Sequence, residues 1–237
     1  MEYDNLFHVH TKRCGHAGNE TDADYIQTAL ELNAKSIYFT DHAPFPENVF
    51  GNRMKMAELD EYVNTLAKLK ERYNHKIDIK VGLEIEYLPK YKQYYCWLKE
   101  KYGIDLFLGQ HICTHNGNYN FAYKDKSEEY EWLAESILEG LDTGFFSALL
   151  HPERIYKNSQ SWGEQQILTA KAIWEATQDK NIPIEYNYSS VVNPKIEYWH
   201  SNFWVYKTHN NIIYGLDAHN TKDLRMGTDF FRVVSEA

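Results

Sequence analysis

The sequence predicts an α/β fold in which parallel strands form a closed or nearly closed barrel. Short apolar runs alternate with longer amphipathic runs along the chain, a pattern typical of parallel strands connected by helices. A histidine or an acidic residue follows most of the apolar runs, where the carboxyl ends of barrel strands meet on one face. The sequence contains no GxGxxG or Walker-type loop, so an open dinucleotide-binding or P-loop sheet has no support.

Hydrophobic periodicity predicts the first half of the elements. Residues 6–10 form an apolar strand, and residues 21–34 form a helix because Ile26, Ala29 and Leu30 recur at helical spacing. Residues 36–40 are β-branched and aromatic, which favours a second strand, and a Pro- and Asn-containing loop follows at 44–52. Apolar residues at helical spacing predict a second helix at 56–73. A third strand at 77–87 and a third helix at 91–102 follow.

The second half repeats this alternation. Apolar runs predict strands at 106–109, 146–150, 182–188 and 212–216. Amphipathic stretches predict helices at 127–141 and 163–178, a short helix at 199–208, and a helix after residue 216. No Gly/Pro/Ser-rich linker interrupts the seven strand–helix units, so we expect a single domain over residues 1–237.

Composition and charge exclude several classes of protein. Apolar residues make up 43% of the 237 residues, which is enough to fill a sizeable core. The net charge of −9 and the absence of a basic run argue against a binder of long nucleic acid. No apolar stretch reaches the roughly 18 residues of a membrane span. The odd count of three cysteines and the lack of an apolar leader predict a cytoplasmic protein without disulfides.

Imidazoles and carboxylates at the predicted strand ends indicate a metal centre. His8 and His10 are two positions apart on a strand, so their side chains point to the same side. Such a pair alone is as often a packed histidine pair, and His16 alone is typical of a solvated loop. Glu84 is a charged residue among apolar neighbours, and burying it is costly unless it is paired or bound to a metal. The other candidates at strand ends are Asp41, His42, His111, His151, Asp217 and His219.

These residues resemble the motifs of the PHP (polymerase and histidinol phosphatase) superfamily, and more closely its histidinol-phosphatase branch. The resemblance covers about residues 6–224 and fills all nine metal-ligand positions. The matching segments are His8-Val9-His10 with His16, Thr40-Asp41-His42-Ala43-Pro44, Gly82-Leu83-Glu84, Gly109-Gln110-His111, His151-Pro152 and Gly215-Leu216-Asp217-Ala218-His219.

The resemblance implies a distorted, TIM-like (β/α)7 barrel that holds three divalent ions, which are zinc, iron or manganese. It assigns one ion to His8, His10, Glu84 and Asp217. Glu84 would bridge to a second ion held by His111 and His151, and a third would lie on His16, His42 and His219. Nitrogen and oxygen ligands without thiolate are compatible with all three metals.

The implied activity is the hydrolysis of L-histidinol phosphate to L-histidinol and phosphate in histidine biosynthesis, by means of a metal-bridging hydroxide. Glu84 and Asp217 would set the metal positions. His219, Asp217 and Asp41 are alternative proton donors to the leaving alkoxide, and Asp41 is equally suited to orient a ligand imidazole. The partner is a small phosphorylated substrate, and the sequence indicates neither a membrane partner nor an oligomeric state.

Cationic side chains after the strands are candidates for binding the phosphate. They are Arg13, Arg53, Arg154, Lys157 and Lys195. Arg53 matches a basic position of histidinol phosphatases, whereas Val191 and Val192 stand where that branch leads us to expect polar residues. The loop residues therefore do not identify the alcohol portion of the substrate.

Three other functions remain as alternatives. One is a PHP phosphoesterase that acts on a nucleotide, a sugar phosphate or a phosphodiester. Another is an amidohydrolase-type C–N hydrolase, which is disfavoured because that class places a bridging Lys after strand four, where this chain has Gln110-His111. A metal-binding regulator without activity is disfavoured because no ligand position is lost.

Overall fold

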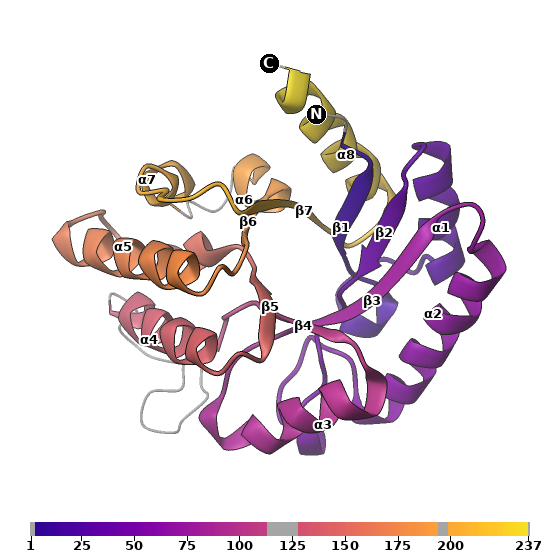
Figure 1. The fold of residues 1–237 in the computed structure, drawn as a ribbon, viewed down its shortest axis with the longest axis horizontal. Coiled ribbons are helices and arrows are strands. Elements are labelled where there is room, and N and C mark those ends of the chain that lie inside the picture. Colours follow the sequence, from indigo (N-terminus) through magenta and orange to yellow (C-terminus); the bar gives the residue numbers. More distant parts are fainter. Residues whose placement is uncertain (1–2, 113–127, 194–198, 237) are drawn as a thin grey trace. The chain divides into compact units, whose positions relative to one another are not determined.

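The computed structural model describes residues 3–112, 128–193 and 199–236. Seven parallel strands follow one another in the order β1-β2-β3-β4-β5-β6-β7 as a closed barrel, and helices connect them (Figure 1). The predicted fold class is therefore confirmed. The strands are β1 (Asn5–Val9), β2 (Ser36–Phe39), β3 (Asp78–Ile85), β4 (Asp105–Leu108), β5 (Phe146–Leu149), β6 (Ile184–Asn187) and β7 (Ile212–Ala218).

The α-helices are α1 (Asp22–Glu31), α2 (Leu59–Tyr73), α3 (Lys92–Tyr102), α4 (Glu129–Asp142), α5 (Glu164–Asp179), α6 (Tyr188–Val192), α7 (His200–Trp204) and α8 (Thr221–Glu236). Short 3-10 turns lie between them: η1 (Lys12–Cys14), η2 (Pro46–Asn48), η3 (Met56–Glu58), η4 (Pro89–Tyr91) and η6 (Pro152–Tyr156). None of the described helices is both long enough and apolar enough to cross a bilayer.

The chain divides into two compact units. The first unit contains Met1–Glu84, Asn187–Ser189 and Tyr214–Ala237, and the second contains Ile85–Tyr186 and Ser190–Ile213. Most predicted metal ligands lie in the first unit, whereas His111 and His151 lie in the second. The expectation of one domain over residues 1–237 stays a prediction.

In the first unit, β1 pairs with β2 and with β7, and β2 pairs with β3. The inward residues of these strands are fully buried, as at Leu6, Val9, Ile37 and Phe39. Helix α8 packs against α1 and β1. A capping box between Thr21 and Asp24 begins α1 and satisfies backbone N–H groups of its first turn.

The register of β1 shifts around His8, which has a left-handed backbone with φ of 69°. Asp217 in β7 is also left-handed, with φ of 51°. A side chain in this region costs roughly 1–2 kcal/mol, and bulges re-aim side chains next to functional sites. Both residues are predicted metal ligands, so part of the backbone strain in this unit lies at the candidate site.

In the second unit, β4 pairs with β5 and β5 pairs with β6. Helices α4 and α5 pack together over these strands, and their buried faces include Trp174, Ile137 and Ile173. The close packing of α4 depends on Gly140, where an added Cβ would lie 2.9 Å from the Tyr87 Cβ.

Two predicted elements differ from the structure. The strand predicted at 182–188 ends at Asn187, and residues 188–192 form the short helix α6. Its apolar Val191 and Val192 carry no periodicity long enough to reveal a single helical turn. The helix predicted at 199–208 is reduced to His200–Trp204, because the chain leaves it at Val205 for the approach to β7.

We predict that Gly140→Ala destabilises the protein despite the better helix propensity of alanine. The new methyl group would meet the Tyr87 Cβ at 2.9 Å and the Leu108 Cδ2 at 3.1 Å, and overpacking of this kind costs about 1–3 kcal/mol. Urea denaturation followed by circular dichroism measures the change. Gly51→Ala is the matched control, because nothing lies within 4 Å of its Cβ position. Equal midpoints for both variants would contradict this packing.

Candidate metal centre

Strand ends position most of the candidate ligands in the first unit. The backbone N–H of His10 donates to the Ala218 carbonyl at 2.9 Å, which ties the end of β1 to β7. His42 and Glu84 form a parallel bridge that continues the pairing of β2 and β3. These bonds bring the side chains at the ends of β1, β2, β3 and β7 together.

Two carboxylates lie among the imidazoles of His8 and His10. The His8 Nε2 is 3.0 Å from the Glu84 Oε2 and 3.6 Å from the Asp217 Oδ1. The His10 Nε2 lies 3.2 Å from each of the same two oxygens. The Glu84 Oε2 is also 3.4 Å from the His42 Nδ1, so one carboxylate oxygen faces three imidazoles.

His10 is fully buried, and its charge balance is unusual. Burial opposes its protonation, but the carboxylates of Asp217 and Glu84 outweigh that effect and raise the pKa of His10. Neither ring nitrogen makes a hydrogen bond of acceptable geometry to the described residues. A buried imidazole without such a bond beside two carboxylates needs a cation or a proton to balance the site.

A second group consists of His16, His42 and His219, whose ligand nitrogens all lie within 4.8 Å of one another. The Nδ1 of His219 is 3.0 Å from the Asp217 carbonyl, and the Nδ1 of His16 is 3.2 Å from the Cys14 carbonyl. A carbonyl only accepts, so both Nδ1 atoms carry the proton. In the neutral rings each Nε2 then presents a lone pair.

The two Nε2 atoms of His16 and His219 lie only 2.8 Å apart. Burial, and then the proximity of His10, lowers the pKa of His219 to about 3, so this ring stays neutral at physiological pH. Two facing lone pairs repel unless a cation lies between them or one ring takes a proton. The donor set therefore fits a divalent ion, and the groups of His, Asp and Glu in this unit are able to hold metal ions.

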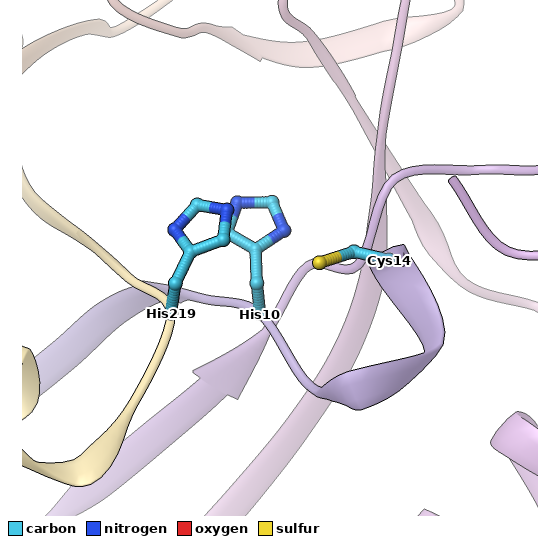
Figure 2. A group of neighbouring side chains, drawn as sticks. All are labelled: His10, Cys14 and His219. Atoms are coloured by element: carbon cyan, nitrogen blue, oxygen red, sulfur yellow. The ribbon is translucent and has the colours of Figure 1, made fainter. Parts of the chain in front are cut away.

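Cys14 is a member of the cluster that the sequence did not predict. Figure 2 shows its side chain beside the rings of His10 and His219, which stack with centroids 4.3 Å apart. The Cys14 sulfur lies within 4.8 Å of a nitrogen of each ring. Burial raises the pKa of the Cys14 thiol to about 12, so the thiol is protonated in the metal-free protein. The sequence signal that could have indicated Cys14 is its position two residues before the predicted ligand His16.

In the second unit, the rings of His111 and His151 lie 4.8 Å apart between their centroids. The His111 Nδ1 is 3.9 Å from the Glu86 Oε1, and the backbone N–H of His151 donates to the Glu185 Oε2 at 2.9 Å. His151 has a φ of 27°, a further left-handed outlier at a predicted ligand. The structure thus brings these two predicted ligands together within their unit.

Asp41, a predicted catalytic carboxylate, bonds to Thr11. It is fully buried, and both of its oxygens accept from Thr11, from the backbone N–H and from the hydroxyl, at 2.6 Å each. Burial raises the pKa of Asp41, against the opposing effects of His10 and Thr11. These contacts join the segments that follow β1 and β2, and a catalytic role for Asp41 stays a prediction.

Arg13 makes extensive bonds within the protein. Its guanidinium is buried and donates to Asp22, Glu61 and Thr11, which uses all five of its N–H groups. A contact between Arg13 and a phosphate stays a prediction, and it would compete with these five bonds. The Arg53 Nη1 donates to the Ala43 carbonyl at 3.3 Å, and its guanidinium lies over the ring of Phe45.

Arg154 and Lys157 line a small pocket in the second unit. The other residues of its lining are Gln110, His111, Glu129, Leu133 and Ile155. The Arg154 Nε donates to the Ser190 Oγ at 3.0 Å, which holds the guanidinium in place. This pocket thus places two predicted phosphate-binding cations beside a predicted metal ligand. Lys195, the remaining candidate, lies outside the described residues.

Comparison with known proteins gives consistent family and fold matches. The sequence profile described as PHP domain matches residues 7–189. The chain is 26% identical over 164 residues to a histidinol-phosphatase of Bacillus subtilis, an alignment that covers 63% of this chain and 61% of that protein. The chain thus spans about three fifths of that relative's length.

A solved structure shares the fold. The histidinol phosphate phosphatase of Lactococcus lactis subsp. lactis, complexed with zinc, L-histidinol and phosphate, superposes with a TM-score of 0.75 at 19% identity. The superposition covers 99% of this chain and 93% of that chain.

We predict that Glu84→Gln lowers metal affinity by roughly a hundredfold or more, because it removes the charge that faces three imidazoles while keeping the shape. Elemental analysis after dialysis and titration against a chelating indicator measure the loss. Glu100→Gln, a change on the exposed face of α3, is the control. A Glu84→Gln protein with the metal content of the wild type would rule out Glu84 as a ligand.

Proposed function

The chain belongs to the PHP domain family, and from that membership we propose that it is a metal-dependent phosphoric monoester hydrolase. The observation that carries the proposal is the pair of facing Nε2 lone pairs on His16 and His219, 2.8 Å apart beside His42. A cation between these nitrogens would remove their repulsion, and a metal-dependent hydrolase holds such a cation before any substrate binds.

We propose three divalent ions, of zinc, iron or manganese, as the cofactors. One set of ligands is His8, His10, Glu84 and Asp217, and another is His16, His42 and His219. The distances within the first unit support both sets. The assignment of His111 and His151 to the remaining ion, with Glu84 as the bridge, rests on the sequence motifs.

When bound, closely spaced divalent ions supply a water of lowered pKa as the nucleophile and offset the charge on the phosphoryl oxygens. The protein's own part is to hold the ligands in place. The carbonyls of Cys14 and Asp217 fix the proton of His16 and of His219 on Nδ1, so that Nε2 is the donor atom in each ring.

The leaving alkoxide needs a proton, and the contacts of the three predicted donors support one of them over the others. The lowered pKa of His219 leaves that ring without a second proton at neutral pH, and Asp41 is held by Thr11. Asp217 lies among the imidazoles, with its Oδ1 3.2 Å from the His10 Nε2. The proposal therefore gives proton transfer to Asp217, whose carboxylate would accept a proton from the attacking water and pass it to the leaving alkoxide.

For the substrate we propose L-histidinol phosphate, hydrolysed to L-histidinol and phosphate in histidine biosynthesis. The names of the relatives from Bacillus subtilis and Lactococcus lactis support this choice. The pocket that holds Arg154 and Lys157 beside His111 supports a small anionic ester, and Arg53 and Lys195 remain further candidates for contacts with it. A cytoplasmic location also stays a prediction, consistent with the free thiols of Cys14 and Cys96.

A second candidate is a PHP phosphoesterase of other specificity, which acts on a nucleotide, a sugar phosphate or a phosphodiester. The helix α6 favours it, because the apolar Val191 and the exposed Val192 stand where the histidinol-phosphatase pattern predicts polar residues.

A phosphatase panel with metal analysis separates the two candidates. The panel contains histidinol phosphate, nucleoside monophosphates, a sugar phosphate and a phosphodiester, each assayed with zinc, manganese and iron. We expect the highest kcat/KM with histidinol phosphate. Activity on the diester alone would contradict the monoesterase, and a protein that neither binds metal nor hydrolyses any ester would contradict the proposed function as a whole.

We predict that Arg154→Met raises the KM for the phosphate ester by roughly tenfold to a hundredfold with a smaller change in kcat, because a fixed guanidinium binds phosphate in the ground state as well as in the transition state. Steady-state kinetics measure both constants. Arg72→Met, on the exposed face of α2, is the control. An unchanged KM would contradict a contact between Arg154 and the phosphate of the substrate.

A further inference from the structure

His16 is placed differently from the other candidate ligands of its unit. His8, His10, His42, Glu84, Asp217 and His219 belong to strands or follow directly after them. His16 instead follows the turn η1, and its side chain is exposed. Its position therefore depends on what holds that turn.

The turn is closed by local hydrogen bonds. The Thr11 hydroxyl accepts from the backbone N–H of Arg13 at 3.4 Å, and the backbone N–H of Cys14 donates to the Thr11 carbonyl at 3.0 Å. Gly15 ends the turn with a φ of 83°, a conformation that glycine adopts without strain. The chain is also held on both sides of the turn, where Thr11 bonds to Asp41 and the Gly18 N–H donates to the His219 carbonyl at 2.7 Å.

Arg13 at the centre of η1 ties the turn to two helices. Its Nη1 and Nη2 donate to the two Asp22 oxygens at 2.7 and 2.8 Å, and its Nε and Nη2 donate to the two Glu61 oxygens at 2.8 and 3.0 Å. The fifth bond, from Nη1, reaches the Thr11 Oγ1 at 3.0 Å. Asp22 lies in α1 and Glu61 in α2. Two bidentate carboxylates on one guanidinium fix both its position and its plane.

The charged and aromatic neighbours of this guanidinium hold it in one position. Burial opposes its charge, but the bonds to Asp22 and Glu61 outweigh that effect and raise the pKa of Arg13 above its ordinary value. Its Cζ also lies 5.5 Å from the centroid of the Tyr62 ring. Moving the turn would break charge-assisted bonds to buried Asp22, which is far more costly than rotating an exposed imidazole.

We propose that Arg13 is a positioning residue for the metal site of His16, His42 and His219: by fixing η1 it sets the place of the His16 Nε2. This inference rests on the proposed metal-dependent function. It assigns to Arg13 no contact with substrate or metal. Loss of Arg13 should therefore weaken the metal site that contains His16 more than the others, because the ligands on strands do not depend on η1.

The test is zinc titration of the metal-free protein against a chromophoric chelator, with elemental analysis for the number of ions bound. In Arg13→Met, we expect one zinc equivalent to bind at least tenfold more weakly, while the remaining affinity changes by less than threefold. His16→Ala identifies the equivalent in question. In the double variant with His16→Ala, Arg13→Met should have no further effect on zinc affinity, because the ligand that it positions is gone.

Two further variants keep the test decisive. Glu61→Ala removes one partner of Arg13 from an exposed position, so it keeps the fold if Arg13→Met does not, and it should weaken the same equivalent by a few-fold. Arg225→Gln removes an exposed ion pair with Glu31 in the same unit and should change no zinc affinity.

Unchanged zinc binding in both Arg13→Met and Glu61→Ala would overturn the inference. So would a loss of all equivalents in proportion to a loss of folding stability. Failure of the proposed function is distinct from both results, because the wild-type protein itself would then bind no zinc.

Discussion

The carboxylate of Glu84 is the group around which the first unit is organised. One of its oxygens lies between 3.0 and 3.4 Å from nitrogens of His8, His10 and His42, which come from the ends of two other strands. A buried negative charge of this kind is tolerated only when positive groups or metal ions surround it. The parallel bridge between His42 and Glu84 and the bulge at His8 are the backbone features that bring those imidazoles to it.

The strain in the backbone follows from the same requirement. His8 and Asp217 adopt left-handed conformations that ordinary strand residues avoid, and His151 does so in the second unit. Each left-handed residue costs conformational free energy that a regular strand conformation would not cost. The three residues share one chemical property, an imidazole or carboxylate suited to bind a metal, so at these positions the strain coincides with the candidate metal ligands.

Much of this could be predicted from the sequence. Alternating runs predicted the barrel, and residue types at the run ends predicted the imidazoles and carboxylates that the structure gathers around Glu84. The bulge at His8 could not be predicted, because period-two alternation places His8 and His10 on one side without any irregularity. Nor could the ion pairs of Arg13 be predicted, since Glu61 is 48 residues away and only the folding of α1 and α2 brings Asp22 and Glu61 to the same guanidinium. A charged residue in a loop is usually solvated, and the buried ion pairs of Arg13 leave no local signal.

The pairing of β1 with β7 has a consequence for how the protein is made. The contact between the rings of His16 and His219 joins residues 203 positions apart, and the bonds between β1 and β7 are of similar span. Contacts so distant in sequence form late, since the entropy of closing a long loop must be overcome before they contribute stability. During synthesis, the first strand leaves the ribosome long before its neighbour in the barrel exists. The imidazoles at the end of β1 therefore meet their partners from β7 only after the roughly 200 residues between them have been translated, so this part of the candidate site is completed late in folding.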